Sequence, residues 1–144
     1  RSTLFPYTTL FRSGRRARFG TGKDSIGPDE ANFDANVGGK EPYSRVGEWR
    51  RGPVAVESFS PNGLGLYQMS GNVWEWVQDC WHASYEGAPT DGSAWEGDCS
   101  ESARVYRGGG WFNYPRILRS TNRFRFASGF ADDYHGFRLV LPVH

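Results

Sequence analysis

Residues 14–53 constrain the fold most, because this long polar stretch has neither helical nor strand periodicity. Its central part reads FGTGKDSIGPDEANFDANVGGKEPYS and is interrupted by glycine and proline. An irregular segment of that length is uncommon in a compact domain unless packed aromatic rings or bound metal ions fix it. The stretch therefore predicts a loop-rich fold, and metal binding is the idea to test.

The composition supports the same expectation. The 144 residues include 19 Gly, 6 Trp, 7 Tyr and 10 Phe, a mixture that suits turns with positive φ and buried aromatic rings. This length predicts one domain. With 17 basic and 16 acidic residues, no net field attracts nucleic acid or an anionic membrane. The visible chain shows neither a signal peptide nor the roughly 20 apolar residues of a membrane span, so we expect neither nucleic acid nor membrane as partner.

Short apolar runs separated by turn signals predict an α+β fold with short antiparallel strands. Strands are expected within residues 53–59 (PVAVESF), 73–77, 103–112 (ARVYRGGGWF, broken by glycines) and 136–141. Between residues 112 and 136, arginine alternates with aromatic or small side chains.

The first thirteen residues are set apart from the fold. Residues 3–13, TLFPYTTLFRS, resemble the translation of a sequencing adapter, so residues 1–13 are interpreted as non-native and residues 14–144 as part of one domain. On this interpretation the chain is a fragment from shotgun sequencing of bacterial DNA that has lost its N-terminal portion. The alternative is an ordinary amphipathic strand, LFPYTTLF.

Two cysteines, Cys80 and Cys99, enclose a polar segment of a length that a stabilising disulfide closes for ~3 kcal/mol. A disulfide would favour an oxidising compartment, periplasmic or extracellular. Two unrelated thiols explain the spacing equally well.

Four segments together carry a family resemblance. They are GLYQMSGNVWEW (65–76), RVYRGGGW (104–111), LRSTNR (118–123) and GFRLV (136–140). In this order and spacing they resemble the formylglycine-generating-enzyme or sulfatase-modifying-factor domain family, whose fold is a C-type-lectin-like variant. The resemblance covers about residues 18–142, which correspond to the C-terminal half of such a domain.

The resemblance implies two calcium sites, built from backbone and side-chain oxygens as calcium prefers. One would use the side chains of Gln68 and Glu75 with the carbonyls of Gly71 and Val73; the other would use Asn32, the Phe33 carbonyl, Glu48 and the Arg50 carbonyl. Relatives more often carry Asp or Asn at position 68, and the stretch around Glu48 aligns loosely. The alternative for Glu75 is a carboxylate that accepts hydrogen bonds from backbone amides in a turn.

The resemblance also bears on catalysis. In the catalytic members two cysteines five residues apart bind copper(I), which requires soft thiolate ligands. Asn113 and Leu118 stand at these positions, and residues 103–144 contain no cysteine. This predicts a non-catalytic member without copper and argues against formylglycine generation. The alternative enzyme is an oxidase, or a sulfoxide synthase of the ergothioneine type, with its metal ligands in a missing N-terminal part.

In relatives, a surface cleft binds peptide at the region that follows Trp111. The candidate ligand-binding residues are Trp111, Asn113, Tyr114, Phe124, Phe126, Phe130, Asp132, Asp133, Tyr134 and His135. Aromatic, Asn and Asp side chains on loops form adaptable recognition surfaces, so we expect a peptide or protein ligand. Two alternatives are a ligand surface diversified by a retroelement and aromatic rings that only fill a loop-rich core.

Four arginines recur in the family-like segments: Arg107, Arg119, Arg123 and Arg138. We expect them to be structural, because a guanidinium group carries five donors and can satisfy several loop carbonyls. The alternative is an anion-binding cluster.

Overall fold

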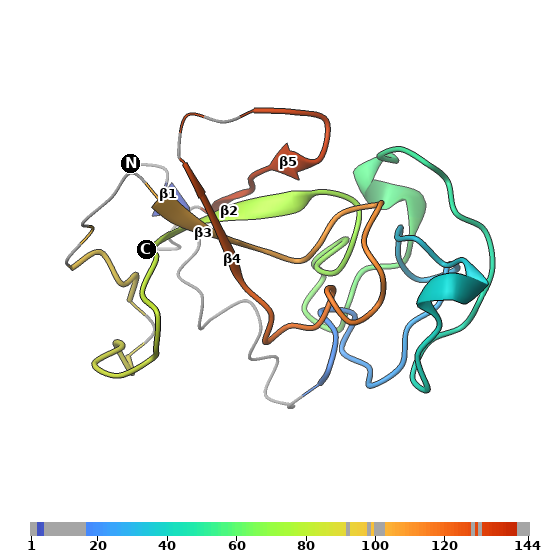
Figure 1. Cartoon of the computed structure of the whole chain (residues 1–144), viewed down its shortest axis with the longest axis horizontal. Helices are drawn as coiled ribbons and strands as arrows, with labels where there is room; N and C mark the ends of the chain where they lie inside the picture. The colour runs from blue at the N-terminus through green and yellow to red at the C-terminus, as the bar shows by residue number, and fades with distance from the viewer. Residues whose placement is uncertain are drawn as a thin grey trace.

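The structure, a computed structural model, describes residues 3–4, 17–91, 93–97, 99, 103–127, 129 and 131–140 (Figure 1). For Thr3, Leu4 and Val140 it describes the backbone alone. The strands gather at one end of the molecule, and the irregular segments that precede β2 form the other end (Figure 1). No helix in the described part of the chain is long and apolar enough to cross a membrane.

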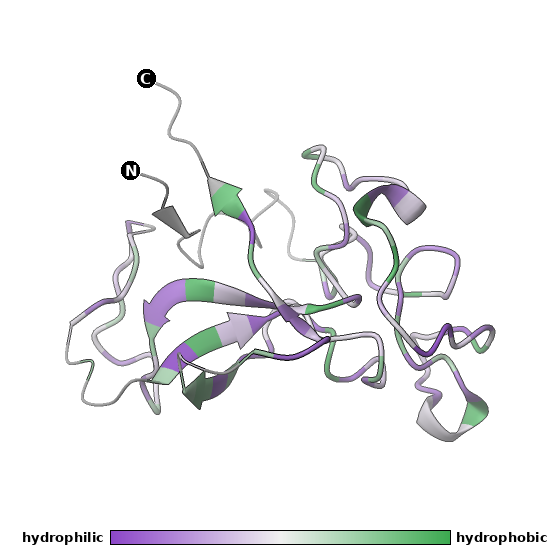
Figure 2. Ribbon diagram, turned by 90° about the horizontal axis from the view of Figure 1, so that it is seen from above, coloured by the Kyte–Doolittle hydropathy of each residue, from purple (hydrophilic) through white to green (hydrophobic). Residues whose placement is uncertain are grey.

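A four-stranded sheet of order β4-β3-β2-β5 organises the first end. Strands β2 (Trp74–Cys80), β3 (Ala103–Arg107) and β4 (Phe124–Ala127) are antiparallel neighbours, and β5 (His135–Gly136) pairs parallel with β2. The register between β2 and β3 shifts between Trp76 and Cys80, as in a β-bulge. Each of the three longer strands contains both hydrophilic and hydrophobic residues (Figure 2).

A second, two-stranded sheet pairs β1 (Thr3–Leu4) with β6 (Leu139–Val140). Strand β1 is the only described part of the first thirteen residues, and the other eleven lie outside the described residues. Whether residues 1–13 are native therefore stays a prediction.

The strand predicted at residues 73–77 is confirmed as β2, and the first part of the strand predicted at residues 103–112 is confirmed as β3, which ends at Arg107 before the glycines. The strand predicted at residues 53–59 is wrong, because Val56–Ser58 forms the 3-10 helix η2, closed by the bond from the Ser58 amide to the Ala55 carbonyl (3.0 Å). Val56 is 59% exposed, so no buried face holds this segment extended. The single strand predicted at residues 136–141 is also wrong, since the chain changes partner between β5 and β6.

Residues 17–53 are irregular, as predicted, apart from the 3-10 helix η1 (Val37–Gly39) and isolated bridges. A compact apolar cluster holds them. Its buried members are Phe19, Ile26, Ala31, Phe33, Ala35 and Leu118. Leu118 belongs to the loop that follows β3, so this cluster joins that loop to the irregular segment. Burial of apolar side chains supplies the order that regular hydrogen bonding does not.

Two asparagines link three loops beside this cluster. The Asn72 amide donates to the Asn32 carbonyl (2.8 Å), and Nδ2 of Asn32 donates to Oδ1 of Asn72 (3.0 Å) and to the Gly52 carbonyl (2.8 Å). Oδ1 of Asn72 also accepts the Val54 amide at 2.8 Å. The preceding Gly71 has φ +87°, and a Cβ there would overlap the Asn32 carbonyl oxygen. The turn therefore needs glycine for both its backbone conformation and its space.

Cys80 and Cys99 form a disulfide with a Cα–Cα distance of 5.4 Å. The structure therefore supports the disulfide and not two unrelated thiols. His82 stacks on Trp95 with ring centroids 3.5 Å apart, and the Cys80 amide donates to the Trp95 carbonyl (2.9 Å). Nη1 of Arg104 lies 2.8 Å from the Cys80 sulfur and 3.2 Å from the Cys99 sulfur. These contacts fix the ends of the 80–99 loop to the sheet.

Candidate functional site

One face of the four-stranded sheet carries a row of aromatic rings. Trp76 lies opposite Tyr106, and Tyr106 lies opposite Phe124 in the strand register. The His135 ring stacks on Trp76 (centroids 5.6 Å apart) and meets Tyr106 edge-on (5.0 Å). Because alternate residues of a strand share a face, Phe126 continues the row and lies 6.5 Å from Tyr106.

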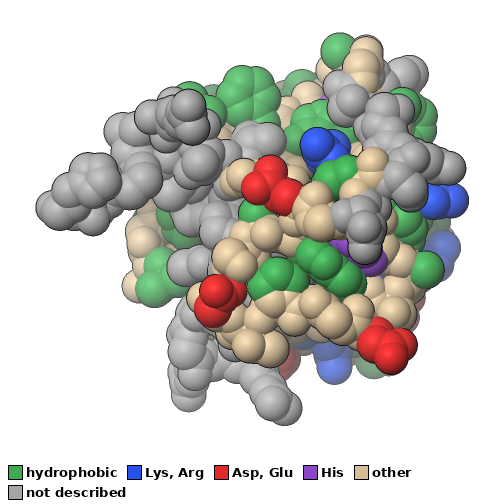
Figure 3. Space-filling model, turned by 90° about the vertical axis from the view of Figure 1, so that its left-hand side faces the viewer, with side chains coloured by type: hydrophobic (Ala, Val, Ile, Leu, Met, Phe, Trp, Pro, Cys, Tyr) green, Lys and Arg blue, Asp and Glu red, His purple; other side chains and the backbone are tan. Residues whose placement is uncertain are grey.

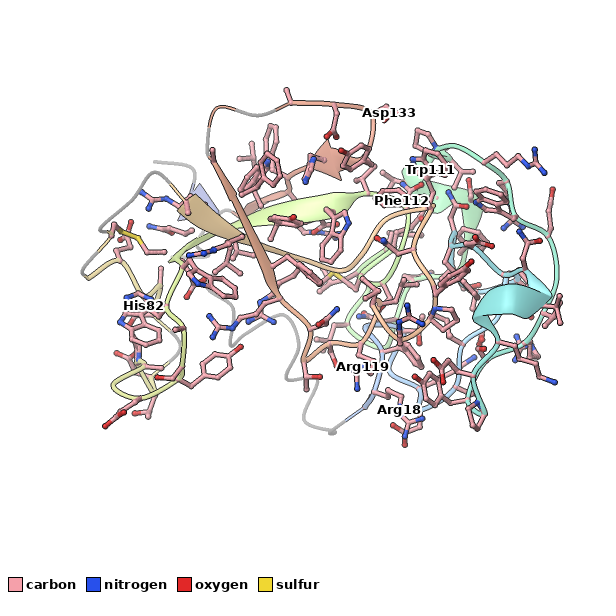
Figure 4. The ribbon with its side chains drawn as sticks, viewed as in Figure 1. Arg18, His82, Trp111, Phe112, Arg119 and Asp133 are labelled. Atoms are coloured by element: carbon pink, nitrogen blue, oxygen red, sulfur yellow. A yellow bond between two sulfur atoms is a disulfide. The ribbon has the colours of Figure 1, made fainter. Side chains whose placement is uncertain are left out.

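Three further rings, those of Trp111, Phe112 and Tyr134, extend this row beyond the sheet. The Phe112 ring lies 5.5 Å from that of Trp111 and 4.8 Å from that of Tyr134, which is itself 4.7 Å from His135. Trp111 and Phe112 lie together on the same side of the molecule as Asp133, opposite Arg18 and Arg119 (Figure 4). We call this set the aromatic surface; its members are Trp111, Phe112, Phe124, Phe126 and Tyr134, with the rings of Trp76, Tyr106 and His135 beneath them.

Asp132 positions two of these rings. Its Oδ1 accepts the Tyr134 amide (2.9 Å) and contacts Nδ1 of His135 (2.8 Å). Desolvation opposes ionisation, but the hydrogen bonds from Tyr134 and His135 hold the pKa of Asp132 below its ordinary value. A side-chain hydrogen bond to Asp132 in turn raises the pKa of the Tyr134 phenol. An anionic Asp132 therefore fixes the orientation of the two rings at the edge of the aromatic surface.

Three predicted ligand residues do not join this surface in the described contacts. Oδ1 of Asn113 accepts the Gly110 amide (2.8 Å), which closes the turn before it. The Tyr114 ring packs against Gly39 so closely that a Cβ at that glycine would overlap it. Phe130 lies outside the described residues.

The sequence analysis missed Phe112, Trp76 and Tyr106 as parts of this surface. The period-2 alternation of β2 and β3, which places Trp76 and Tyr106 on the face of Phe124, is the signal that identifies them. Phe112 follows Trp111 directly, but the sequence carries no sign of its contact with Tyr134.

At the first predicted calcium site, the Gln68 side-chain oxygen has no partner among the described residues, whereas the Glu75 carboxylate is paired with an arginine. Oε1 of Gln68 is buried without a hydrogen-bond partner among the described residues, while its Nε2 donates to the Ala55 carbonyl (2.7 Å). The Glu75 carboxylate forms an ion pair with Arg138, whose Nη2 also donates to the Tyr67 carbonyl (3.0 Å). Glu75 thus binds a guanidinium and not the backbone amides of a turn.

The second predicted calcium site likewise combines an unpaired amide oxygen with a carboxylate that pairs with an arginine. Oδ1 of Asn32 is buried and unpaired within the described part of the chain, and Phe33 beside it is fully buried. Glu48, however, is 69% exposed at its side chain and pairs with Arg50 (3.2 Å). The described residues contain no group of three His, Cys, Asp or Glu side chains placed to hold a metal ion. The two unpaired amide oxygens are hard ligands of the kind that calcium prefers, whereas both carboxylates are paired with arginines.

Two other positions singled out by sequence have structural contacts. Leu118 is fully buried in the apolar cluster, and its carbonyl accepts the Ser70 hydroxyl (2.9 Å). Together with the turn closed by Asn113, this leaves neither position with a side chain that ligates a soft metal.

The arginines mostly bind loop carbonyls, as expected. Arg107 donates to the Asn122 carbonyl (3.1 Å), Arg119 to that of Arg116 (2.8 Å), and Arg138 to that of Tyr67. Arg123 differs, because its guanidinium lies over the rings of Trp81 (4.4 Å) and Tyr85 (4.3 Å).

The family model of the sulfatase-modifying factor enzyme 1-like domain matches residues 9–143. The chain belongs to this family. Similar solved structures include PvdO from Pseudomonas aeruginosa, with a TM-score of 0.62 and 40% identity over 77% of this chain and 38% of that one. The expected α+β, C-type-lectin-like fold of the sulfatase-modifying-factor domain is thus confirmed.

Curated relatives carry this domain in different settings. The chain is 36% identical over 103 residues to the serine/threonine-protein kinase pkn1 of Chlamydia pneumoniae, over 70% of this chain and 16% of the kinase. It is 37% identical over 92 residues to the formylglycine-generating enzyme of Mus musculus, over 58% of this chain and 24% of the enzyme. The chain therefore spans less than a quarter of either relative.

Proposed function

We propose that this sulfatase-modifying-factor domain is a non-catalytic module that binds a peptide or protein. The observation that carries the proposal is the place of Leu118, fully buried in the apolar cluster at a position where the resemblance puts a copper-binding thiolate. At the other such position, the carboxamide oxygen of Asn113 accepts a hydrogen bond from the Gly110 amide. Neither residue offers the soft ligand that copper(I) needs.

The aromatic surface is the proposed binding site. Phe112, Phe124 and Phe126 are exposed. Beneath them Trp76 meets Tyr106 edge-on and stacks on His135, which keeps the surface rigid. Rigid aromatic side chains supply contact area at a low entropic cost, and Asp132 offers an anionic acceptor at its edge. This combination favours a peptide with apolar side chains and at least one donor.

Selection of random peptides displayed on phage against the purified chain tests this function. We expect the selected peptides to bind the wild type, and Trp111→Ala and Tyr134→Ala to weaken that binding by about tenfold or more. Tyr85→Ala is the matched control, because Tyr85 is an exposed aromatic residue on the 80–99 loop, away from the aromatic surface. Circular dichroism checks that each variant folds.

The oxidase alternative is tested with the same protein. After incubation with copper(I), oxygen and a cysteine-containing peptide, and then reduction of any disulfide, mass spectrometry should show the peptide with its cysteine intact. Conversion of that cysteine to an aldehyde would overturn the non-catalytic assignment. Peptides that bind equally to all four proteins would overturn the aromatic surface as the site.

Calcium is part of the proposal as a structural ion. The buried, unpaired oxygens of Asn32 and Gln68 support it, since a hard cation satisfies such groups. The disulfide between Cys80 and Cys99 supports an oxidising compartment, periplasmic or extracellular, as the site of action.

A further inference from the structure

Strand β4 has two chemically different faces and lies at one edge of the sheet. Phe124 and Phe126 point to the aromatic surface, so Arg125 and the preceding Arg123 share the opposite face. All four residues of β4 are exposed. No described strand pairs with the outer edge of β4, whose inner edge bonds to β3 (Figure 1).

The arginine face of β4 carries concentrated positive charge. Arg123 lies over the Trp81 and Tyr85 rings, and Arg125 lies over the same Trp81 ring at 5.5 Å. Nη2 of Arg107 at the end of β3 lies 2.9 Å from the Tyr85 hydroxyl, so a third guanidinium group meets the same side chain. Among the described residues, no carboxylate lies within 4 Å of Arg123 or Arg125. Like charges that neighbour one another across strands are unfavourable, so this arrangement favours an added anionic group.

The aromatic rings also fix the geometry of these guanidinium groups. A guanidinium that lies on a ring keeps its N–H donors at its rim, where a carboxylate can accept two of them at once. Trp81 and Tyr85 are brought to this position by the 80–99 loop, which the disulfide closes.

We propose that the outer edge of β4 binds an extended segment of a partner protein, as an added strand in which acidic residues alternate with apolar ones. Its backbone would bond to the outer edge of β4, with which no described strand pairs, in the mode of peptide binding known as β-strand addition. Its acidic side chains would lie beside Arg123 and Arg125, and its apolar side chains beside Phe124 and Phe126.

Other occupants fit this edge less well. Pairing with β4 of a second copy would bring arginines beside arginines. Nucleic acid would need ring faces for stacking, but guanidinium groups cover those of Trp81 and Tyr85. The strand-bearing end of the molecule also carries acidic side chains among its basic ones, so it presents no extended positive field (Figure 3). An acidic, alternating strand satisfies both faces of β4.

The two sites share Phe124 and Phe126, but Arg123 and Arg125 lie on the face of the sheet opposite the aromatic surface, and Trp111 and Tyr134 lie outside β4. Variants of the two sites therefore separate the two proposals. Trp111→Ala should leave strand addition at β4 unchanged, and Arg125→Glu should leave the peptides selected on the aromatic surface bound.

The test uses fluorescence anisotropy with a labelled peptide of sequence Glu-Val-Glu-Val-Glu-Val. We expect it to bind the full chain, and Arg125→Glu to weaken binding by about tenfold or more. The matched control is Arg116→Glu, the same charge reversal at an exposed arginine outside β4. A Lys-Val-Lys-Val-Lys-Val peptide should not bind the wild type.

A second probe separates strand addition from charge attraction alone. The same acidic peptide, methylated at alternate backbone nitrogens, keeps its charge and loses the donors that a strand needs. We expect it to bind at least about tenfold more weakly. Equal binding of both peptides, equal weakening by Arg125→Glu and Arg116→Glu, or no binding to the wild type would each overturn the proposal. Dimerisation of the wild type that Phe124→Pro abolishes would assign the edge to a second copy and overturn it as well.

Discussion

The guanidinium group of Arg138 binds the Glu75 carboxylate of β2 and donates to the Tyr67 carbonyl at 3.0 Å. Arg138 lies between β5 and β6, so this pair ties the end of the chain to the centre of the sheet. A guanidinium thus holds a carboxylate that the family resemblance assigns to calcium. The pair has consequences for stability that depend on pH.

Replacement of Glu75 by Gln should flatten the dependence of stability on pH. Burial raises the pKa of the Glu75 carboxyl above its ordinary value of 4.5, against the lowering influence of Arg138. Because the folded state binds this proton more tightly than the unfolded chain, its contribution is complete below the unfolded pKa and is lost as pH rises through the folded pKa. Urea unfolding of wild type and Glu75→Gln from about pH 4 to 8 measures the difference.

The exposed Glu48 provides the control for this experiment. Glu48→Gln should keep the wild-type profile, because its carboxylate is mostly solvated. A Glu75→Gln profile that declines with pH as steeply as the wild type would contradict the assignment to Glu75.

Gly71→Ala should destabilise the protein far more than Gly87→Ala. Both glycines have positive φ (+87° and +78°), so both substitutions carry the backbone cost of about 1 kcal/mol. Only at Gly71 does the new Cβ overlap the Asn32 carbonyl oxygen, and around Gly87 the space is open. We expect an additional loss of about 2 kcal/mol or more at Gly71, measured by urea unfolding. Equal losses would show that the Asn32–Asn72 link tolerates displacement.

The sequence predicted the fold class and the two central strands. Strand β2 was predictable because Trp74, Trp76 and Val77 belong to a nearly continuous apolar run of strand length, and the structure buries Trp74 and Val77. The strand predicted at residues 53–59 was wrong. Val54 and Val56 have a high propensity for strands, but neither is buried against the rest of the protein. Local propensity decides an element only where tertiary packing agrees with it.

The partners of single side chains were harder to predict. Glu75 and Arg138 lie 63 positions apart, and no local pattern pairs them. Phe112 and Tyr134 are likewise distant in the sequence, and the pairing of β5 with β2 places Tyr134 beside Phe112. Contacts of this kind depend on the topology of the sheet, whereas the asparagine turn at residues 71–72 follows from local backbone chemistry.

Calcium should bind, and Gln68→Asp should strengthen that binding by about tenfold, because an added carboxylate raises the charge of the ligand set. The buried Oε1 of Gln68 is the oxygen that the substitution replaces with a charged one. Calorimetric titration of wild type and variant measures both affinities. Asp91→Asn, which changes an exposed loop carboxylate, is the control and should bind as the wild type does. No heat of binding in any of the three proteins would remove calcium from the proposed function.

Reduction of the disulfide should lower the free energy of unfolding by about 3 kcal/mol, the value expected for a closed loop of this length. The two cysteines are separated by 19 positions in sequence. Urea unfolding with and without dithiothreitol measures the loss. The Cys80→Ser, Cys99→Ser double variant should have the lower stability in both conditions, and a response of that variant to dithiothreitol would show an effect unrelated to the disulfide.

Leu118→Ala should cost about 2–5 kcal/mol of stability, because a fully buried leucine leaves a cavity when truncated. Leu118 packs with Phe19, Ile26 and Phe33 of the irregular segment, so the loss should also loosen residues 17–53. Leu64→Ala is the matched control, since Leu64 is 53% exposed and its truncation should change stability by no more than about 0.5 kcal/mol. Urea unfolding gives both values, and hydrogen exchange reports on residues 17–53. If both variants lose the same small amount, the side chain of Leu118 is not part of the core, and the strongest support for a non-catalytic domain is lost with it.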